Sequence, residues 1–125
     1  MRPEEVKPEK WLNIEVIFND DVYQGYSVAW GEYKEDWMET SKWCIATRWN
    51  GLEQELGSPV LNETPVWHRE PQYVTLPILE KLLTLSRTRE EWFHYTGKIK
   101  WAIKDFVDKA EDLKVVQEQY AQHYN

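Results

Sequence analysis

The apolar residues of this chain change their spacing once, near Pro77, and that change limits the folds that the chain can form. Before Pro77, three segments alternate apolar and polar positions with a period of two, which is typical of half-buried β-strands. After Pro77, apolar residues recur every three or four positions, as they do on one face of an α-helix. Strands followed by helices predict an α+β fold with an antiparallel sheet.

The three expected strands cover residues 11–18, 22–33 and 42–50. The turn-forming run Asn19-Asp20-Asp21 separates the first two strands by so few residues that we expect an antiparallel hairpin. Residues 72–76 are a candidate for a short fourth strand. The predicted sheet is therefore antiparallel and has three to four strands.

Two or three helices are expected to follow the sheet and to pack on one of its faces. Thr88 and Glu91 have the spacing of a capping box, which predicts a helix start there. From Trp92 to Tyr124 the apolar positions form a heptad-like seam, which indicates a long C-terminal helix. We expect a break at Thr96-Gly97, because glycine often ends a helix; the alternative is one unbroken helix from residue 88 to residue 123.

A chain of 125 residues fits one domain. Residues 1–10 hold two prolines and three glutamates, so we expect a flexible N-terminal arm followed by a single α+β domain over residues 11–125. The arm lacks the apolar run of a secretory signal, and the chain has no uncharged stretch long enough to span a bilayer. The single cysteine, Cys44, cannot form an intramolecular disulfide. These features favour a cytoplasmic protein without a membrane segment.

The charge balance disfavours nucleic acid as a partner. The chain has 15 basic and 22 acidic residues, a net charge of −7, whereas phosphate backbones need clustered cations. The remaining route to nucleic acid is a local patch that joins Arg48, Arg69, Arg87 and Arg89. The three histidines lie far apart without the spacing of metal ligands, so we expect no metal and no cofactor.

No sequence motif indicates a particular enzymatic reaction. Cys44 stands in the middle of an expected strand, where a buried and inert thiol is the usual outcome. The carboxylates fall mainly in turns and loops, and the nucleotide-binding, hydrolase and metalloprotease motifs are absent. We therefore favour a binding or adaptor protein over an enzyme, without excluding an enzyme.

The chain is rich in aromatic residues, with eight Trp, seven Tyr and three Phe. Composition alone favours a core filled with these bulky rings. The predicted strands, however, place aromatic residues on both faces of the sheet, and large aromatic side chains are common at interfaces. We expect self-association as a homodimer through the seam of the last helix, with five residues that form the contact: Ile99, Ile103, Phe106, Leu113 and Tyr120. The alternative is a pocket for a small-molecule or protein ligand under the irregular loop of residues 50–71, lined by Arg48, Trp49, Trp67 and His68.

Four short motifs between Lys42 and Leu83 suggest relatives. They are Arg48-Trp49-Asn50-Gly51, Leu56-Gly57-Ser58-Pro59, Pro65-Val66-Trp67 and Leu76-Pro77-Ile78-Leu79. This pattern resembles small uncharacterised bacterial proteins, some of which are carried on the mobile gene cassettes of integrons. The resemblance implies no activity.

Overall fold

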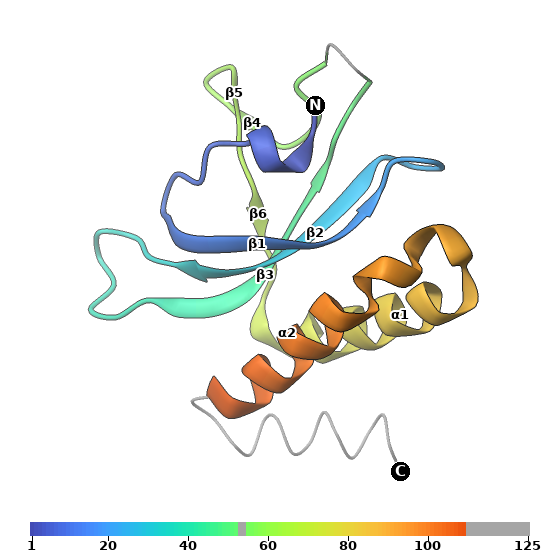
Figure 1. The fold of residues 1–125 in the computed structure, drawn as a ribbon. Coiled ribbons are helices and arrows are strands. Elements are labelled where there is room, and N and C mark those ends of the chain that lie inside the picture. The colour runs from blue at the N-terminus through green and yellow to red at the C-terminus, as the bar shows by residue number, and fades with distance from the viewer. Residues whose placement is uncertain (53–54, 110–125) are drawn as a thin grey trace. The chain divides into compact units, whose positions relative to one another are not determined.

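The computed structural model describes residues 1–52 and 55–109 (Figure 1). The chain forms two compact units, which we call the sheet unit (Met1–Glu70) and the helical unit (from Pro71 onward). The sequence predicted a single domain over residues 11–125. An antiparallel sheet is followed by helices, and this confirms the predicted α+β class.

The sheet has four antiparallel strands in the order β1-β2-β3-β6. They are β1 (Trp11–Asp20), β2 (Tyr26–Tyr33), β3 (Lys42–Trp49) and the two-residue β6 (His68–Arg69). The fourth strand was expected at residues 72–76, and that expectation is wrong, because this stretch forms the 3-10 turn η2 (Gln72–Val74) and the start of a helix. The predicted hairpin of the first two strands is confirmed.

The turn between β1 and β2 lies later than the sequence suggested. The Asp20 carboxylate accepts hydrogen bonds from the backbone N–H groups of Tyr23 and Gln24, at 2.9 and 3.0 Å. Gly25 then takes a φ of +68°, which glycine adopts without steric cost. As a result β1 continues to Asp20, and β2 begins at Tyr26 rather than at Val22.

One face of the sheet is covered by the N-terminal residues. The 3-10 turn η1 (Pro3–Glu5) leads to Val6, which is buried with Trp11 and Trp67 against the small residues of β2 and β3, Ala29, Cys44 and Ala46. Gly31 keeps this face flat, since a Cβ there would lie 2.7 Å from the Trp11 ring. Residues 1–10, expected as a flexible arm, therefore contribute to the core of the sheet unit.

The loop that follows β3 contains its own small hairpin. Strands β4 (Val60–Leu61) and β5 (Thr64–Pro65) pair antiparallel across Asn62 and Glu63, which have φ values of 50° and 63°. Residues 50–71 were predicted as an irregular loop, and within its described part this segment also contributes β6 to the sheet.

The helical unit is a hairpin of two helices, α1 (Thr75–Thr88) and α2 (Thr96–Lys109), joined by the 3-10 helix η3 (Glu90–Tyr95). Figure 1 shows α2 running back along α1. The Thr96 hydroxyl donates to the Ser86 hydroxyl at 2.9 Å and so links the two helices near the turn. Each helix buries an apolar stripe, formed by Leu76, Leu79 and Leu82 in α1 and by Ile99, Ala102 and Phe106 in α2.

The connection between the helices corrects two details of the sequence analysis. Thr88 is the last residue of α1, and its hydroxyl donates back to the carbonyls of Thr84 and Leu85, so the predicted capping box does not form. The break expected at Thr96-Gly97 is also misplaced, because Gly97 lies inside α2, which follows η3 directly. The alternative of one unbroken helix from residue 88 does not form either, since Arg89 is extended and residues 90–95 are 3-10. The expected continuation of the last helix beyond Lys109 lies outside the described residues.

Candidate functional site

The four residues of the predicted ligand pocket all belong to the sheet unit, but the sheet separates them into two pairs. Along β3, Arg48 alternates with Trp49, so their side chains point to opposite faces. His68 lies opposite Thr47, on the same face as Trp49, whereas Trp67 joins the core on the face of Cys44 and Ala46. The structure therefore does not bring the four side chains together in one pocket.

Arg48 is used to hold the loop in place. Its side chain is only 1% exposed, and its guanidinium donates to the carbonyl oxygens of Val66, at 2.8 Å, and of Leu56. A guanidinium is suited to this task because its donors form a rigid planar fork. Burial lowers the pKa of Arg48. Arg48 therefore clamps the loop from inside the sheet unit, where its burial keeps it from a ligand at the surface.

Next to Arg48, the backbone at Trp49 lies close to the backbone at Ser58. The backbone groups of Trp49 and Ser58 exchange two hydrogen bonds, with N–O distances of 2.7 and 2.8 Å. Gly57 has a φ of +71°, and a Cβ at this position would collide with the carbonyl oxygen of Trp49. Only glycine fits such a backbone crossing, so the first part of the loop is tightly constrained.

Trp49 and His68 remain accessible. The Trp49 side chain is 50% exposed, and its ring meets that of Tyr26 edge to face, with centroids 4.7 Å apart. His68 is exposed on β6, with its Nε2 atom 3.6 Å from the carboxylate of Glu70. That carboxylate also accepts a hydrogen bond from the Thr47 hydroxyl at 2.9 Å. Both side chains therefore lie on the open surface of the sheet unit and do not line an enclosed site.

A buried polar network at the end of the sheet was missed by the sequence analysis. Asn50 donates from its amide to the side-chain oxygen of Asn19 at 2.9 Å, and the Ser27 hydroxyl lies 2.8 and 3.1 Å from the two amide oxygens. These three residues are buried. The sequence presented Asn19 and Asn50 as turn formers, and their partners depend on the strand register. The network fixes the ends of three strands to one another.

A second missed cluster surrounds Tyr33 at the other end of β2. The Tyr33 hydroxyl donates to the Glu35 carboxylate, which also pairs with Lys10 at 3.2 Å. The guanidinium of Arg69 lies 4.5 Å from the centre of the Tyr33 ring. Burial, together with this hydrogen bond and the charge of Glu35, raises the pKa of Tyr33 to about 12. The hydrogen bond from Tyr33 lowers the pKa of Glu35, so neither group is poised to exchange a proton near neutral pH.

Cys44 is equally unsuited to nucleophilic chemistry. Its side chain is buried on the covered face of the sheet, and burial raises the pKa of its thiol to about 12. The thiolate, which is the reactive form, is therefore scarce at neutral pH. Within residues 1–52 and 55–109, no group of three or more His, Cys, Asp and Glu side chains is placed to hold a metal ion.

The helical unit contains an apolar surface groove, which we call the helical groove. It has a free volume of about 390 Å³ between α1 and α2. Three partly exposed apolar residues form its floor, Leu83, Ile103 and Val107, and four charged residues border it: Glu80, Lys100, Lys104 and Asp108.

The helical groove contains one of the five predicted self-association residues. Ile103 lies on its floor, whereas Ile99 and Phe106 are buried. Leu113 and Tyr120 lie outside the described residues. Within the described residues, α2 thus contributes the apolar side chains of Ile103 and Val107 to the groove.

Comparisons with protein-family models, with curated proteins and with solved structures found no match. The resemblance to integron cassette proteins stays a prediction. Of the helices in the described part of the chain, none combines the length and the apolar character needed to cross a bilayer.

Proposed function

We propose that the protein is a non-enzymatic cytoplasmic binding protein that self-associates as a homodimer through the helical groove. The observation that carries the proposal is the arrangement of this surface, in which an apolar floor is bordered by two acidic and two basic side chains. A buried apolar centre with a polar rim is the usual anatomy of a protein interface.

The charges make the groove suitable for a second copy of the same surface. A twofold axis places the same patch of both subunits face to face, so the patch must be complementary to itself. A border with equal numbers of carboxylates and ammonium groups allows each Lys to face an Asp or Glu of the other subunit. Lys104 and Asp108 lie 3.1 Å apart within α2, and both are well exposed, so they can exchange partners across the axis.

The reactive groups of the sheet unit support a non-enzymatic role. Tyr33 and Cys44 both have pKa values near 12, and Arg48 is committed to loop carbonyls. The cytoplasmic location is supported by the single cysteine in the sequence. The alternative, a ligand pocket under the loop of residues 50–71, stays a prediction.

The proposal is tested by measuring the mass of the protein in solution across a concentration series, with Ile103→Asp as the disrupting variant. An aspartate at the centre of the groove would be buried without a partner in the dimer, so we expect dissociation at least about tenfold easier than in the wild type. Leu12→Asp is the matched control, because Leu12 is an exposed apolar residue of the sheet unit and lies outside the groove.

Charge-reversal substitutions distinguish a specific interface from non-specific association. Lys104→Glu alone places like charges across the twofold axis and should weaken the dimer, whereas Lys104→Glu combined with Asp108→Lys should restore it. Equal masses for the wild type, Ile103→Asp and both charge variants at every concentration would overturn the proposal.

A further inference from the structure

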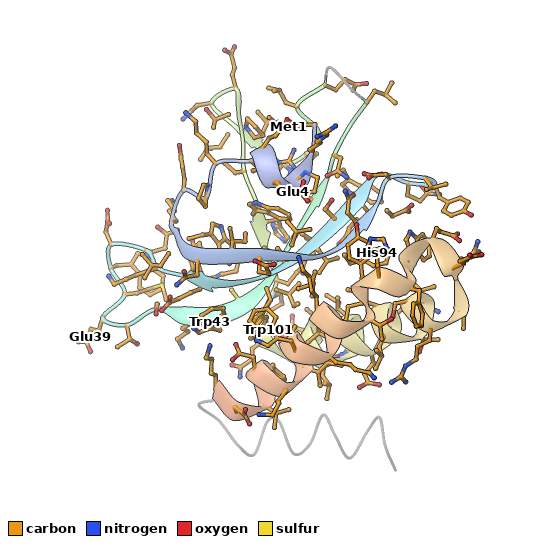
Figure 2. All side chains as sticks on the ribbon, in the orientation of Figure 1. Met1, Glu4, Glu39, Trp43, His94 and Trp101 are labelled. Carbon is orange, nitrogen blue, oxygen red and sulfur yellow. The ribbon has the colours of Figure 1, made fainter. Side chains whose placement is uncertain are left out.

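A second cavity in the helical unit lies at the turn between the helices, away from the groove residues. It has a volume of about 460 Å³ and is lined by Arg87, Thr88, Arg89, Glu90, Phe93 and His94. We call it the basic cavity. Figure 2 shows His94 on the turn that joins α1 to α2, with Trp101 further along α2. A volume of this size falls within the range of about 300–1,000 Å³ that is typical of small-molecule sites.

Two guanidinium groups line the basic cavity, although the whole chain has a net charge of −7. They belong to Arg87 and Arg89, which lie there together with the imidazole of His94. Guanidinium groups bind phosphate with two parallel hydrogen bonds, so a pair of them favours a phosphate group over a singly charged anion.

The interactions of Arg89 orient it without burying it. Its guanidinium carbon lies 5.6 Å from the centre of the Trp92 ring, and one of its nitrogens lies 3.8 Å from the Glu91 carboxylate. The Arg89 side chain is about half exposed, so this long ion pair contributes little to stability. A dianionic phosphate can therefore compete with Glu91 for the guanidinium of Arg89.

Phe93 adds a flat apolar surface to the same cavity. It is 64% exposed, although Phe is usually buried. An aromatic ring beside cationic groups is the combination that binds a planar ring and a phosphate of one ligand, because bases stack on aromatic side chains and phosphates pair with guanidinium groups. The His94 ring lies 4.0 Å from that of Tyr95, which holds the imidazole in place at the rim.

We propose that the basic cavity binds a nucleoside monophosphate, with the phosphate on Arg87 and Arg89 and the base on Phe93. The Glu90 carboxylate, the one acidic group in the lining, is suited to accept hydrogen bonds from ribose hydroxyls. A mononucleotide is favoured over a nucleic-acid chain because the cavity matches one nucleotide in size and because the net charge of −7 repels a long polyanion.

The test is calorimetric titration of the full chain with four probes, namely AMP, adenosine, ribose 5-phosphate and inorganic phosphate. AMP should bind most tightly, and adenosine and ribose 5-phosphate should each bind at least about tenfold more weakly, because each lacks one of the two contacts. In an amide NMR spectrum, AMP should shift the signals of residues 87–94.

Substitutions distinguish the phosphate contact from the base contact. Arg87→Gln and Arg89→Gln should each weaken AMP and ribose 5-phosphate by about five- to tenfold and leave adenosine unchanged. Phe93→Leu should weaken AMP and adenosine but not ribose 5-phosphate. Lys81→Gln is the matched control, since it removes one positive charge from the exposed surface of α1 outside the cavity and should leave AMP binding unchanged.

Three results would overturn the proposal. They are no binding of AMP by the folded wild-type protein, an equal loss of AMP affinity in Lys81→Gln and Arg87→Gln, and binding of a short single-stranded oligonucleotide without binding of AMP. Because Arg87 and Phe93 are exposed, these variants should keep the thermal midpoint of the wild type, which verifies that a loss of binding is not a loss of folding.

Discussion

Arg48 in the sheet unit and Arg87 in the helical unit carry the same guanidinium in very different surroundings. Arg48 is almost completely buried and donates to two carbonyls of the loop that follows it, whereas Arg87 is exposed at the rim of a cavity. A buried donor is committed to the fold, because removing it leaves its acceptors unpaired. An exposed one contributes little to stability and is available to a ligand. The residue type alone therefore does not identify a binding site.

The sharpest test of this comparison is the removal of each arginine in turn. We expect Arg48→Ala to lower the free energy of unfolding by about 3 kcal/mol, since the carbonyls of Val66 and Leu56 lose their donor in a buried position. Arg87→Ala should change it by no more than about 0.5 kcal/mol. Urea denaturation followed by tryptophan fluorescence measures both. Similar losses for the two variants would remove the distinction between a structural and an exposed arginine.

Two glycines extend the comparison from side chains to the backbone. Gly57→Ala should cost about 2 kcal/mol, because its Cβ would collide with the carbonyl oxygen of Trp49 and because alanine disfavours a φ of +71°. Gly97 lies in α2 with nothing within 4 Å of its Cβ position, so Gly97→Ala should stabilise the protein by about 0.5–1 kcal/mol. Thermal unfolding of both variants checks the two signs. A neutral Gly57→Ala variant would show that the loop is not constrained as described.

The Tyr33 cluster predicts a dependence of stability on alkaline pH. The pKa of Tyr33 is raised from 10.0 to about 12, so its contribution is fully present below pH 10 and is lost as the pH rises to about 12. The free energy of unfolding of Tyr33→Phe should therefore fall less steeply over that pH window than that of the wild type. Urea denaturation at several pH values measures both. An identical pH profile for the wild type and Tyr33→Phe would contradict the assigned environment of the hydroxyl.

The smallest effect is expected at the exposed ion pair of Lys109 and Asp105 in α2. Its charged atoms lie 2.8 Å apart at positions i and i+4, and such helical pairs contribute about 0.3–0.5 kcal/mol. Lys109→Ala should therefore shift the urea midpoint only slightly, and added salt should remove the difference. A loss above about 1 kcal/mol would mean that charged groups of the helical unit are structural as well.

Much of the fold was predictable because it depends on local periodicity. The alternation in β1, β2 and β3 and the change of period near Pro77 identified the sheet and the helices that follow it. Strand β6 was missed because its two residues, His68 and Arg69, carry no apolar pattern and pair only through the path of the loop. The turn at Asn62 and Glu63 was missed because both residues have positive φ although neither is glycine, the residue type that usually indicates such a turn.

The site was less predictable because it depends on contacts between distant residues. The partners of Arg48 lie 8 and 18 residues away, so its role as a clamp follows from the path of the loop and not from the Arg48-Trp49-Asn50-Gly51 motif. The seam indicated a helix with a break at Thr96-Gly97, whereas the turn lies earlier, at the extended residue Arg89 and the 3-10 helix η3. That turn places Arg87 and His94 around one cavity.

We propose that two copies of the chain associate through the helical unit, at Ile103. Light scattering over a concentration series, on the wild type and on Ile103→Asp, measures this association. The proposal predicts that the wild type approaches twice 15.1 kDa and that Ile103→Asp remains near 15.1 kDa at the same concentrations. A wild type that stays at 15.1 kDa throughout, or a dimer that Ile103→Asp leaves intact, would contradict it.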